Sequence, residues 1–355
     1  MLVIAVALTR PLRNRTANRS LAVLIIVLIG TIAPWAIGFA GFYDRWQWLS
    51  FAPFSHPLAI APFFYFYLCA LVHGRLPDRH ALHLVAPLAF AAALFASFLL
   101  PLEVKLAWAR ISSSWFDNVI SIGIVIGFIY YGRLSWRLLS DYRKWLANER
   151  SDDDRFAARW LQNILIGAAC LLLVWSVYEI YNAVLGLNYL GLMGLYIVIA
   201  ILGTALAIEG WRHAHLPFPA MQPAHSVKSE REHEPAQEHG SDRAAEADRW
   251  AARIRKDRLY EDPEISLALA ARHLATNQSY LSRAVNEGLG MNWSTLINGM
   301  RCEAVAERLS VDPSADILAT ALECGFNSKA SFNRFFRAYH GMTPSAFRRE
   351  TSQNS

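Results

Sequence analysis

The chain has 355 residues, of which 54% are hydrophobic and only 18% are charged, and its formal net charge is +5 at pH 7. A composition this apolar excludes an ordinary soluble protein and an intrinsically disordered one, because both need a larger polar or charged fraction. The last third of the chain has an ordinary soluble balance. The apolar excess therefore lies in the first two-thirds, which predicts a membrane part followed by a soluble part.

Six apolar runs approach the roughly 20 residues that a helix needs to cross a bilayer. They cover residues 21–41, 57–73, 83–101, 119–139, 161–181 and 189–210. The stretch 1–9 is also apolar but too short to span alone, so it is expected to be an interfacial stub or the remainder of a further helix that begins upstream. The sequence thus predicts a polytopic transmembrane helical bundle over residues 1–212.

Lysine and arginine residues of the short loops gather on one side of these predicted spans, and such residues favour the cytoplasmic side. The cytoplasmic set is Arg10, Arg13, Arg15, Arg19, Arg75, Arg79, Arg133, Arg137, Arg143, Lys144, Arg150, Arg155 and Arg159. The opposite side has only Arg45, Lys105 and Arg110. Six alternating spans then return the chain to the cytoplasm after residue 210.

Glu179 stands near the outer end of the fifth predicted span, beside Tyr178 and Tyr181. An ionisable residue inside a membrane is costly and is often functional. These three residues are therefore candidates for ligand sensing. The alternative is a carboxylate that reaches water at the membrane edge, next to an aromatic belt at the interface.

Residues 213–243 are rich in Pro, His, Glu, Gln, Ala and Ser, which predicts a disordered linker. Its five histidines lack regular spacing or a cysteine companion, so they are interpreted as solvated side chains and not as metal ligands. The four cysteines, Cys69, Cys170, Cys302 and Cys324, show no paired spacing and are expected to be free thiols. We expect no metal site and no cofactor.

The remainder of the chain, residues 244–350, reads as a series of helices. An amphipathic helix is predicted over 244–260, followed by helices over 267–275 and 278–287. A long helix is predicted over 293–309, and its inward positions are Leu296, Ile297, Met300, Val305 and Leu309. Such a helix is a rigid bar between the segments that precede and follow it.

The stretch 325–344 has the pattern of the second helix of a helix-turn-helix. Phe332, Phe335, Phe336 and Tyr339 recur at helical spacing and predict a buried stripe, while no acidic residue occurs between Gly325 and Arg349. Ala321 and Gly325 stand four residues apart, as a small contact residue followed by a turn glycine. Ala271 and Ala275 repeat this spacing fifty residues earlier, so a duplicated helix-turn-helix is predicted.

The second unit resembles the signature of the AraC/XylS family of transcription regulators. The matching residues are Gly325, Phe326, Ser331, Phe332, Arg334, Phe336, Gly341, Thr343 and Pro344. Tyr280-Leu281-Ser282-Arg283 and Leu289-Gly290 resemble the first unit of that family, although Ala275 replaces the usual glycine and Thr276 replaces an apolar residue. The resemblance covers about the last hundred residues and leaves the membrane part unexplained.

This resemblance implies that the soluble domain binds double-stranded DNA, with its two recognition helices in successive major grooves about 34 Å apart. The candidate DNA contacts are Gln278, Ser279, Ser282, Arg283 and Asn286 in the first unit and Lys329, Asn333, Arg334 and Arg337 in the second. The resemblance further implies a bacterial regulator that acts as a homodimer and contacts RNA polymerase.

The fold class expected from the whole sequence is all-α: a transmembrane helical bundle followed by a cytoplasmic helical domain with two helix-turn-helix units. The expected function is a non-enzymatic, one-component regulator in the bacterial inner membrane, controlled by an unknown small-molecule or envelope signal and in contact with membrane lipid. The alternative is a membrane enzyme or transporter with an appended DNA-binding domain. Against it, the predicted spans contain no paired acids, no His-Glu-x-x-His motif and no Gly-x-Ser-x-Gly element.

Overall fold

The computed structural model describes residues 1–10, 14–39, 41, 45–46, 48, 52–152, 156, 158–185, 191, 193–221 and 240–353. Over these residues the protein is all-helical and has no strand, which confirms the predicted fold class. The chain divides into two compact units. The first combines Met1–Ser140 with Arg159–Met221, and the second combines Asp141–Ala158 with Gln222–Ser355.

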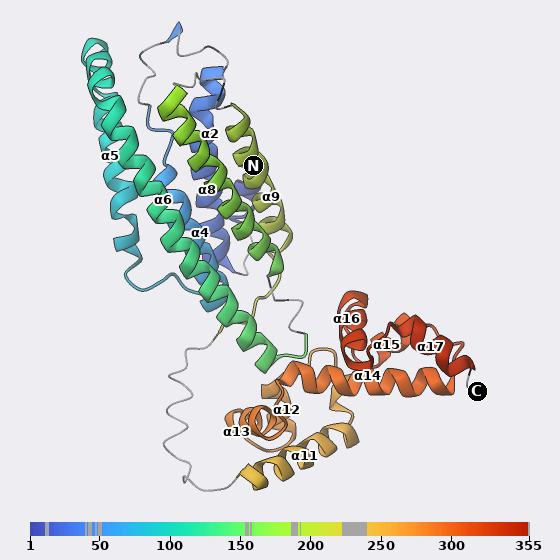
Figure 1. Cartoon of the computed structure of the whole chain (residues 1–355). Coiled ribbons are helices and arrows are strands. Elements are labelled where there is room, and N and C mark those ends of the chain that lie inside the picture. The colour runs from blue at the N-terminus through green and yellow to red at the C-terminus, as the bar shows by residue number, and fades with distance from the viewer. Residues whose placement is uncertain are drawn as a thin grey trace. The chain divides into compact units, whose positions relative to one another are not determined.

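The first unit is a bundle of apolar helices (Figure 1). Five of its helical stretches are long and apolar enough to cross a membrane among the described residues: Arg15–Gly38, His80–Phe98, Asn118–Glu149, Arg159–Tyr178 and Met193–Arg212. The second predicted span, residues 57–73, forms the shorter apolar helix Pro57–His73. The helices of this unit are α1 (Leu2–Ala7), α2 (Arg15–Phe39), η2 (Pro57–Ala59), α4 (Ile60–His73), η3 (His80–Leu84), α5 (Val85–Phe98), α6 (Leu102–Glu149, as far as Ser140), α8 (Arg159–Leu185) and α9 (Met193–Arg212).

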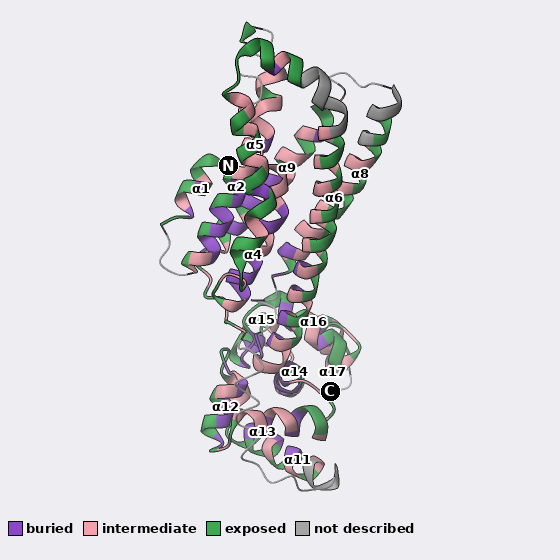
Figure 2. Cartoon of the chain, turned by 90° about the vertical axis from the view of Figure 1, so that its left-hand side faces the viewer, coloured by how far each residue is buried: buried purple, intermediate pink, exposed green. Residues whose placement is uncertain are grey.

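The interior of this bundle is formed mainly by α2 and α4. Leu21, Ile25, Leu68 and Val72 are almost fully buried, and Figure 2 shows buried residues concentrated in these two helices. Large apolar side chains on α5, α6, α8 and α9 point outward instead, among them Leu173, which is 69% exposed. Exposed apolar surface spread over several neighbouring helices is typical of contact with lipid chains.

The segment that follows α9 differs from its prediction as linker. Residues 213–221 pack on the first unit, since the side-chain amide of Asn18 donates to the carbonyl of Ala214 at 3.2 Å and the Met221 amide donates to the carbonyl of Val72 at 2.8 Å. Phe218 is buried. Hydrogen bonds to backbone groups, which composition does not report, hold this segment. The rest of the predicted linker, from residue 222 to 239, lies outside the described residues.

The second unit contains the soluble helices of the chain. These are α11 (Gly240–Lys256), η5 (Leu259–Glu261), α12 (Leu267–His273), α13 (Gln278–Arg283), the π-helix η6 (Ala284–Gly288), α14 (Trp293–Val311), α15 (Ile317–Glu323), α16 (Lys329–His340) and α17 (Pro344–Gln353). Side chains cap the N-termini of α12 to α16: each of Ser266, Asn277, Asn292, Asp316 and Ser328 accepts a backbone hydrogen bond from the first turn. A cap of this kind contributes about 1 kcal/mol.

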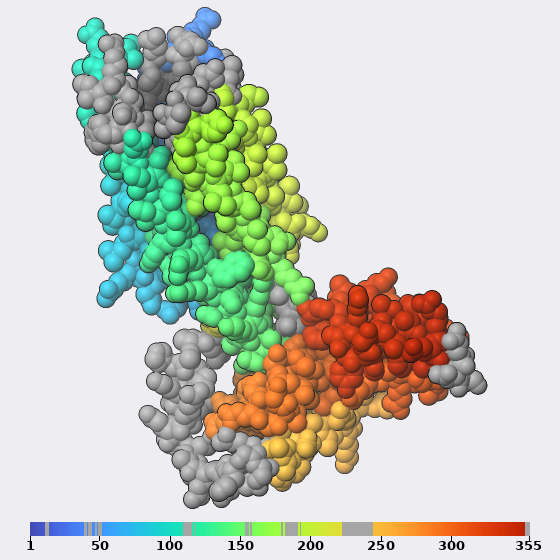
Figure 3. All heavy atoms as spheres, in the orientation of Figure 1, coloured from blue at the N-terminus to red at the C-terminus, as the bar shows by residue number. Residues whose placement is uncertain are grey.

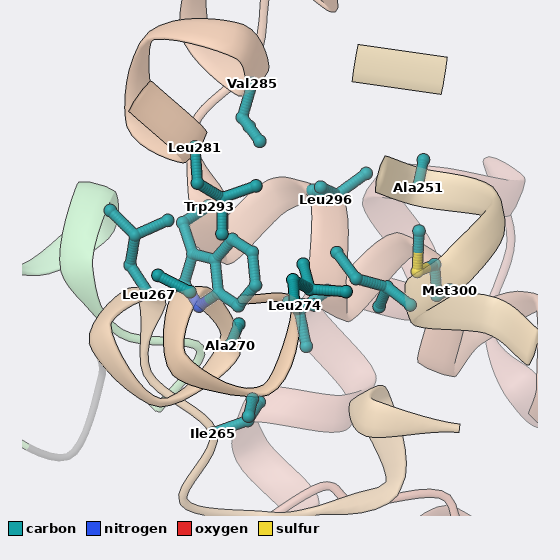
Figure 4. Close-up of a cluster of buried hydrophobic side chains, with 13 residues drawn as sticks. Ala251, Ile265, Leu267, Ala270, Leu274, Leu281, Val285, Trp293, Leu296 and Met300 are labelled. Atoms are coloured by element: carbon teal, nitrogen blue, oxygen red, sulfur yellow. The ribbon is translucent and has the colours of Figure 1, made fainter. Parts of the chain in front are cut away.

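Helix α14 carries two separate hydrophobic cores, one near each end. Trp293 and Ile297 belong to the first core, which includes residues of α11, α12 and α13 (Figure 4). Val305 and Leu309 belong to the second core, which includes Phe326, Phe332 and Phe336. Figure 1 accordingly shows α12 and α13 at one end of α14 and α15–α17 at the other. All five inward positions predicted for this helix are buried, which confirms its predicted inward face.

Candidate nucleic-acid interface

The helix pairs α12–α13 and α15–α16 form two helix-turn-helix units with the same turn. In the first, the Thr276 amide donates to the Ala271 carbonyl and the Ala275 amide donates to the Arg272 carbonyl. In the second, the Phe326 amide donates to the Ala321 carbonyl and the Gly325 amide to the Leu322 carbonyl. These paired bonds define a Schellman motif, which ends a helix with one residue in the left-handed conformation.

The left-handed residue is Ala275 in the first turn and Gly325 in the second, with φ of 54° and 95°. The replacement of the usual glycine by Ala275 therefore leaves the turn intact. An L-residue in this conformation is strained by about 1–2 kcal/mol because its Cβ approaches the backbone. The first turn thus carries a strain that the second avoids.

Changing Ala275 to glycine is expected to stabilise the first helix-turn-helix unit by about 0.5–1 kcal/mol. The free energy gained by relief of the backbone strain exceeds the entropic cost of the more flexible unfolded chain. Hydrogen exchange of residues 267–288 in the intact chain should slow about two- to fivefold. The control is Ala338→Gly, at an exposed position inside α16, where glycine costs about 1 kcal/mol and exchange should accelerate. Unchanged or faster exchange in Ala275→Gly would mean that the alanine methyl makes contacts worth more than the strain.

Gly325 has no room for a side chain. A Cβ built on it would lie 2.5 Å from the carbonyl oxygen of Tyr260 and 2.8 Å from that of Glu261. Both carbonyls belong to η5, which crosses directly over the turn. The second turn therefore requires glycine for steric reasons as well as for its backbone conformation.

The second recognition helix, α16, separates an apolar face from a polar one. Phe332 and Phe336 are buried in the second core, whereas Lys329, Asn333 and Arg337 are exposed. Arg334 is half-buried, and its guanidinium lies 4.4 Å from the centre of the Phe335 ring. The helix contains no acidic residue, so its open face suits a polyanion.

The predicted burial of Tyr339 on this helix is wrong. Tyr339 is 51% exposed, its ring lies against Gly299 of α14, and its hydroxyl donates a hydrogen bond to the Glu303 carboxylate. That bond, together with partial burial, raises the pKa of Tyr339 to about 12. Helical spacing places Tyr339 at the edge of the apolar stripe, where the phenol bonds across to α14 and the ring stays half in solvent.

The first recognition helix, α13, has one buried residue, Leu281, and continues into η6. Its candidate DNA contacts are less open than those of α16: Ser279, Ser282 and Arg283 are half-buried and Asn286 is exposed. The Asn286 side-chain amide donates to the Ser282 hydroxyl at 3.2 Å. Gln278 is half-buried, and its amide donates to the carboxylate of Glu149. All nine candidate residues thus lie on α13, η6 or α16, and their contact with DNA stays a prediction.

A buried arginine on α14 holds the segment Tyr260–Asp262 that covers the second turn, and the sequence analysis missed it. Arg301 is 1% exposed; its guanidinium donates to the carbonyls of Tyr260 at 2.7 Å and Asp262 at 2.8 Å. It also donates to Asn298 Oδ1 at 3.0 Å and Ser151 Oγ at 3.1 Å. Burial lowers the pKa of Arg301 to about 10, and the nearby carboxylates oppose the shift, so it remains charged at neutral pH.

The spacing of Arg301 contains a signal of this role. It lies four residues after Ile297 and four before Val305, on the face of α14 that the apolar residues mark as inward. An arginine at an inward position must find internal acceptors. The carbonyls of the segment Tyr260–Asp262 provide them, and this segment also covers Gly325.

The bundle of apolar helices, which is the first compact unit of the fold, contains a cavity of about 1040 Å³ among its described residues. Residues of α2, α4, α5, α6, α8 and α9 line it, including Leu28, Phe128, Leu172 and Leu206. Of the predicted sensing residues, Tyr178 is half-buried and Tyr181 is exposed, and neither lines the cavity. The side chain of Glu179 lies outside the described residues.

Residues 270–350 match a family of AraC-type helix-turn-helix domains. The match begins within α12 and covers the rest of the two helix-turn-helix units and α14, seen in Figure 3 as the orange and red parts of the chain. The match does not include the bundle of apolar helices, which is the first compact unit of the fold. No curated protein and no solved structure matches the chain.

Proposed function

We propose that the protein is a membrane-anchored, one-component transcription regulator that binds DNA through α13 and α16. A sequence-specific DNA-binding regulator is supported by the helix-turn-helix domain. The observation that carries the proposal is the pairing on α14 of two units with the same hydrogen bonds in the turn. The described residues of the same chain also include five helices apolar enough to cross a membrane.

The basis for sequence reading lies in the exposed side chains of α16. Asn333 can form a bidentate pair with N6 and N7 of an adenine, and Arg337 can form one with O6 and N7 of a guanine. Lys329 at the start of the helix is suited to a phosphate. Two such helices on a rigid bar suit repeated half-sites along one face of the duplex. The proposal also includes a homodimer of the chain and its contact with RNA polymerase.

Genome-wide DNA binding by the intact, membrane-inserted chain tests this function. The wild type should give discrete peaks with a repeated motif, and Asn333→Ala or Arg337→Ala should weaken affinity for that motif about 5- to 100-fold. The control is Arg255→Ala, which removes one positive charge from α11, where Arg255 pairs with Glu303 at 3.0 Å. It should change affinity far less. An equal loss in Arg337→Ala and Arg255→Ala would mean that Arg337 contributes only its charge, and the absence of any motif would contradict the proposal.

The membrane part is proposed to sit in the bacterial inner membrane with the second unit in the cytoplasm, on the basis of the loop charges and of the position of DNA. Most of the residues that line its cavity are apolar, which favours an apolar or amphiphilic signal. The volume of about 1040 Å³ is at the upper end for small-molecule sites. Ser135 lines this cavity, and its buried hydroxyl has no hydrogen-bond partner among the described residues. A ligand head group would satisfy it. Equal DNA affinity for the intact chain and for a fragment starting at Gly240 would contradict control by the membrane part.

A further inference from the structure

The segment 141–158, between the fourth and fifth predicted spans, packs on the first helix-turn-helix unit. It belongs to the second compact unit of the fold. Arg150 and Ser266 form an isolated antiparallel bridge, and the Ser151 hydroxyl donates to the Ile265 carbonyl at 3.0 Å. Ser151 is 1% exposed. The residues that directly follow α6 are therefore buried against the residues that lead into α12.

The contact is held by a polar network. The Ser151 carbonyl accepts from Asn298 Nδ2 at 2.9 Å, and its hydroxyl accepts from Arg301 Nη2 at 3.1 Å. Asn298 and Arg301 are both almost fully buried. Two hydrogen bonds join the Arg150 guanidinium to Asp152, at 2.6 and 3.0 Å, and fix the turn that presents Ser151. Buried polar groups need partners in defined directions, so this surface selects one docked geometry.

The same contact occupies a candidate DNA-reading residue. Gln278, the first residue of α13, donates its side-chain amide to Glu149, the last residue of α6. A glutamine reads adenine only when its amide nitrogen and oxygen are both available to the base. Burial raises the pKa of Glu149 to about 7, and its ionised form, beside the start of a recognition helix, also repels the phosphates of DNA.

We propose that segment 141–158 is a docking partner of the first helix-turn-helix unit and competes with DNA for α13. The proposal rests on the function proposed above and specifies its regulation. Glu149 ends α6, the helix that also contains the fourth predicted span. A displacement of that helix by a signal would withdraw Glu149 from Gln278 and make α13 available to DNA. Gln278 binds Glu149 in the docked state and DNA in the released state. The signal and DNA therefore both act on the equilibrium between these two states.

The test measures DNA affinity of the intact chain in phospholipid nanodiscs, with a duplex that carries the motif found for the wild type. Glu149→Ala should bind about tenfold more tightly, because the hydrogen bond between Gln278 and the Glu149 carboxyl group holds the docked state. Ser151→Ala, which lies away from α13, should act in the same direction with a smaller gain. The control is Asp141→Ala, which removes one acid from an exposed position of the same segment and should leave affinity within about twofold.

A second measurement does not depend on affinity. In a chain carrying Glu149→Cys and Gln278→Cys, a short bis-maleimide should link the two residues, and saturating duplex should suppress the link. The Glu149→Cys chain alone is the control for the native cysteines. Wild-type affinity in Glu149→Ala, weaker binding, or a cross-link that DNA leaves unchanged would overturn the docking proposal while DNA binding stands. Absence of specific binding in every variant would instead remove the proposed function.

Discussion

Replacing Gly325 with alanine is expected to unfold the second helix-turn-helix unit and abolish specific DNA binding. The alanine would be strained by about 1–2 kcal/mol in the left-handed conformation. Its Cβ would also lie 2.5 Å from the Tyr260 carbonyl oxygen, and relief of such overpacking costs about 1–3 kcal/mol more. The total, about 3 kcal/mol, is large for a unit of this size.

Hydrogen exchange on the intact chain would locate this effect. Protection of residues 317–340 should fall sharply, while residues 251–285 of the first core stay protected. Gly341→Ala is the matched control, because Gly341 also has a positive φ, 74°, but has no atom within 4 Å of a built Cβ. It should cost only the backbone strain. If both variants lost the same protection, the close contact with η5 would not be what requires glycine at position 325.

The second large effect is expected at Arg301. Arg301→Met removes the donors that satisfy the carbonyls of Tyr260 and Asp262, and each buried acceptor left without a partner costs about 1–3 kcal/mol. Breaking a buried charged network typically costs about 3–5 kcal/mol. Arg301→Lys should recover little, since an ammonium group cannot make the four divergent bonds of the guanidinium.

Arg308, two turns further along the same helix, provides the control variant for Arg301. Arg308 pairs with Glu323 at 3.0 Å and with Glu261 at 3.4 Å, in a more exposed setting. Arg308→Met should cost less than about 1 kcal/mol. Chemical denaturation followed by Trp293 fluorescence and by proteolysis at residues 257–266 would rank the variants. Equal stability of Arg301→Met and Arg308→Met would show that water replaces the buried donors.

Periodicity predicted the architecture of the DNA-binding domain because a helix buries residues at fixed spacing. The inward residues of α14, the stripe of Phe332 and Phe336, and the repeated turn all follow from local pattern. Five of the six predicted spans correspond to helices of sufficient length. The exception, residues 57–73, forms η2 and the shorter α4, most of whose residues are buried.

The parts that sequence could not predict depend on contacts between distant residues. The pairing of Glu149 with Gln278 and of Ser151 with Asn298 joins positions 129 and 147 residues apart. No periodic pattern reports such a contact, and loop charge pointed only to a cytoplasmic side. Tyr339 illustrates the limit at short range, because spacing fixes the direction of a side chain but not whether a polar partner holds it at the surface.

The division of α14 between two cores has a consequence for synthesis of the chain. The first core is drawn from residues 251–300 and the second from residues 302–336, with no shared member. Each core is therefore complete within one continuous stretch, and contacts that are close in sequence form quickly. The first helix-turn-helix can fold on the emerging chain while α15 and α16 are still being translated, and the segment 141–158 that packs on it has by then already been made.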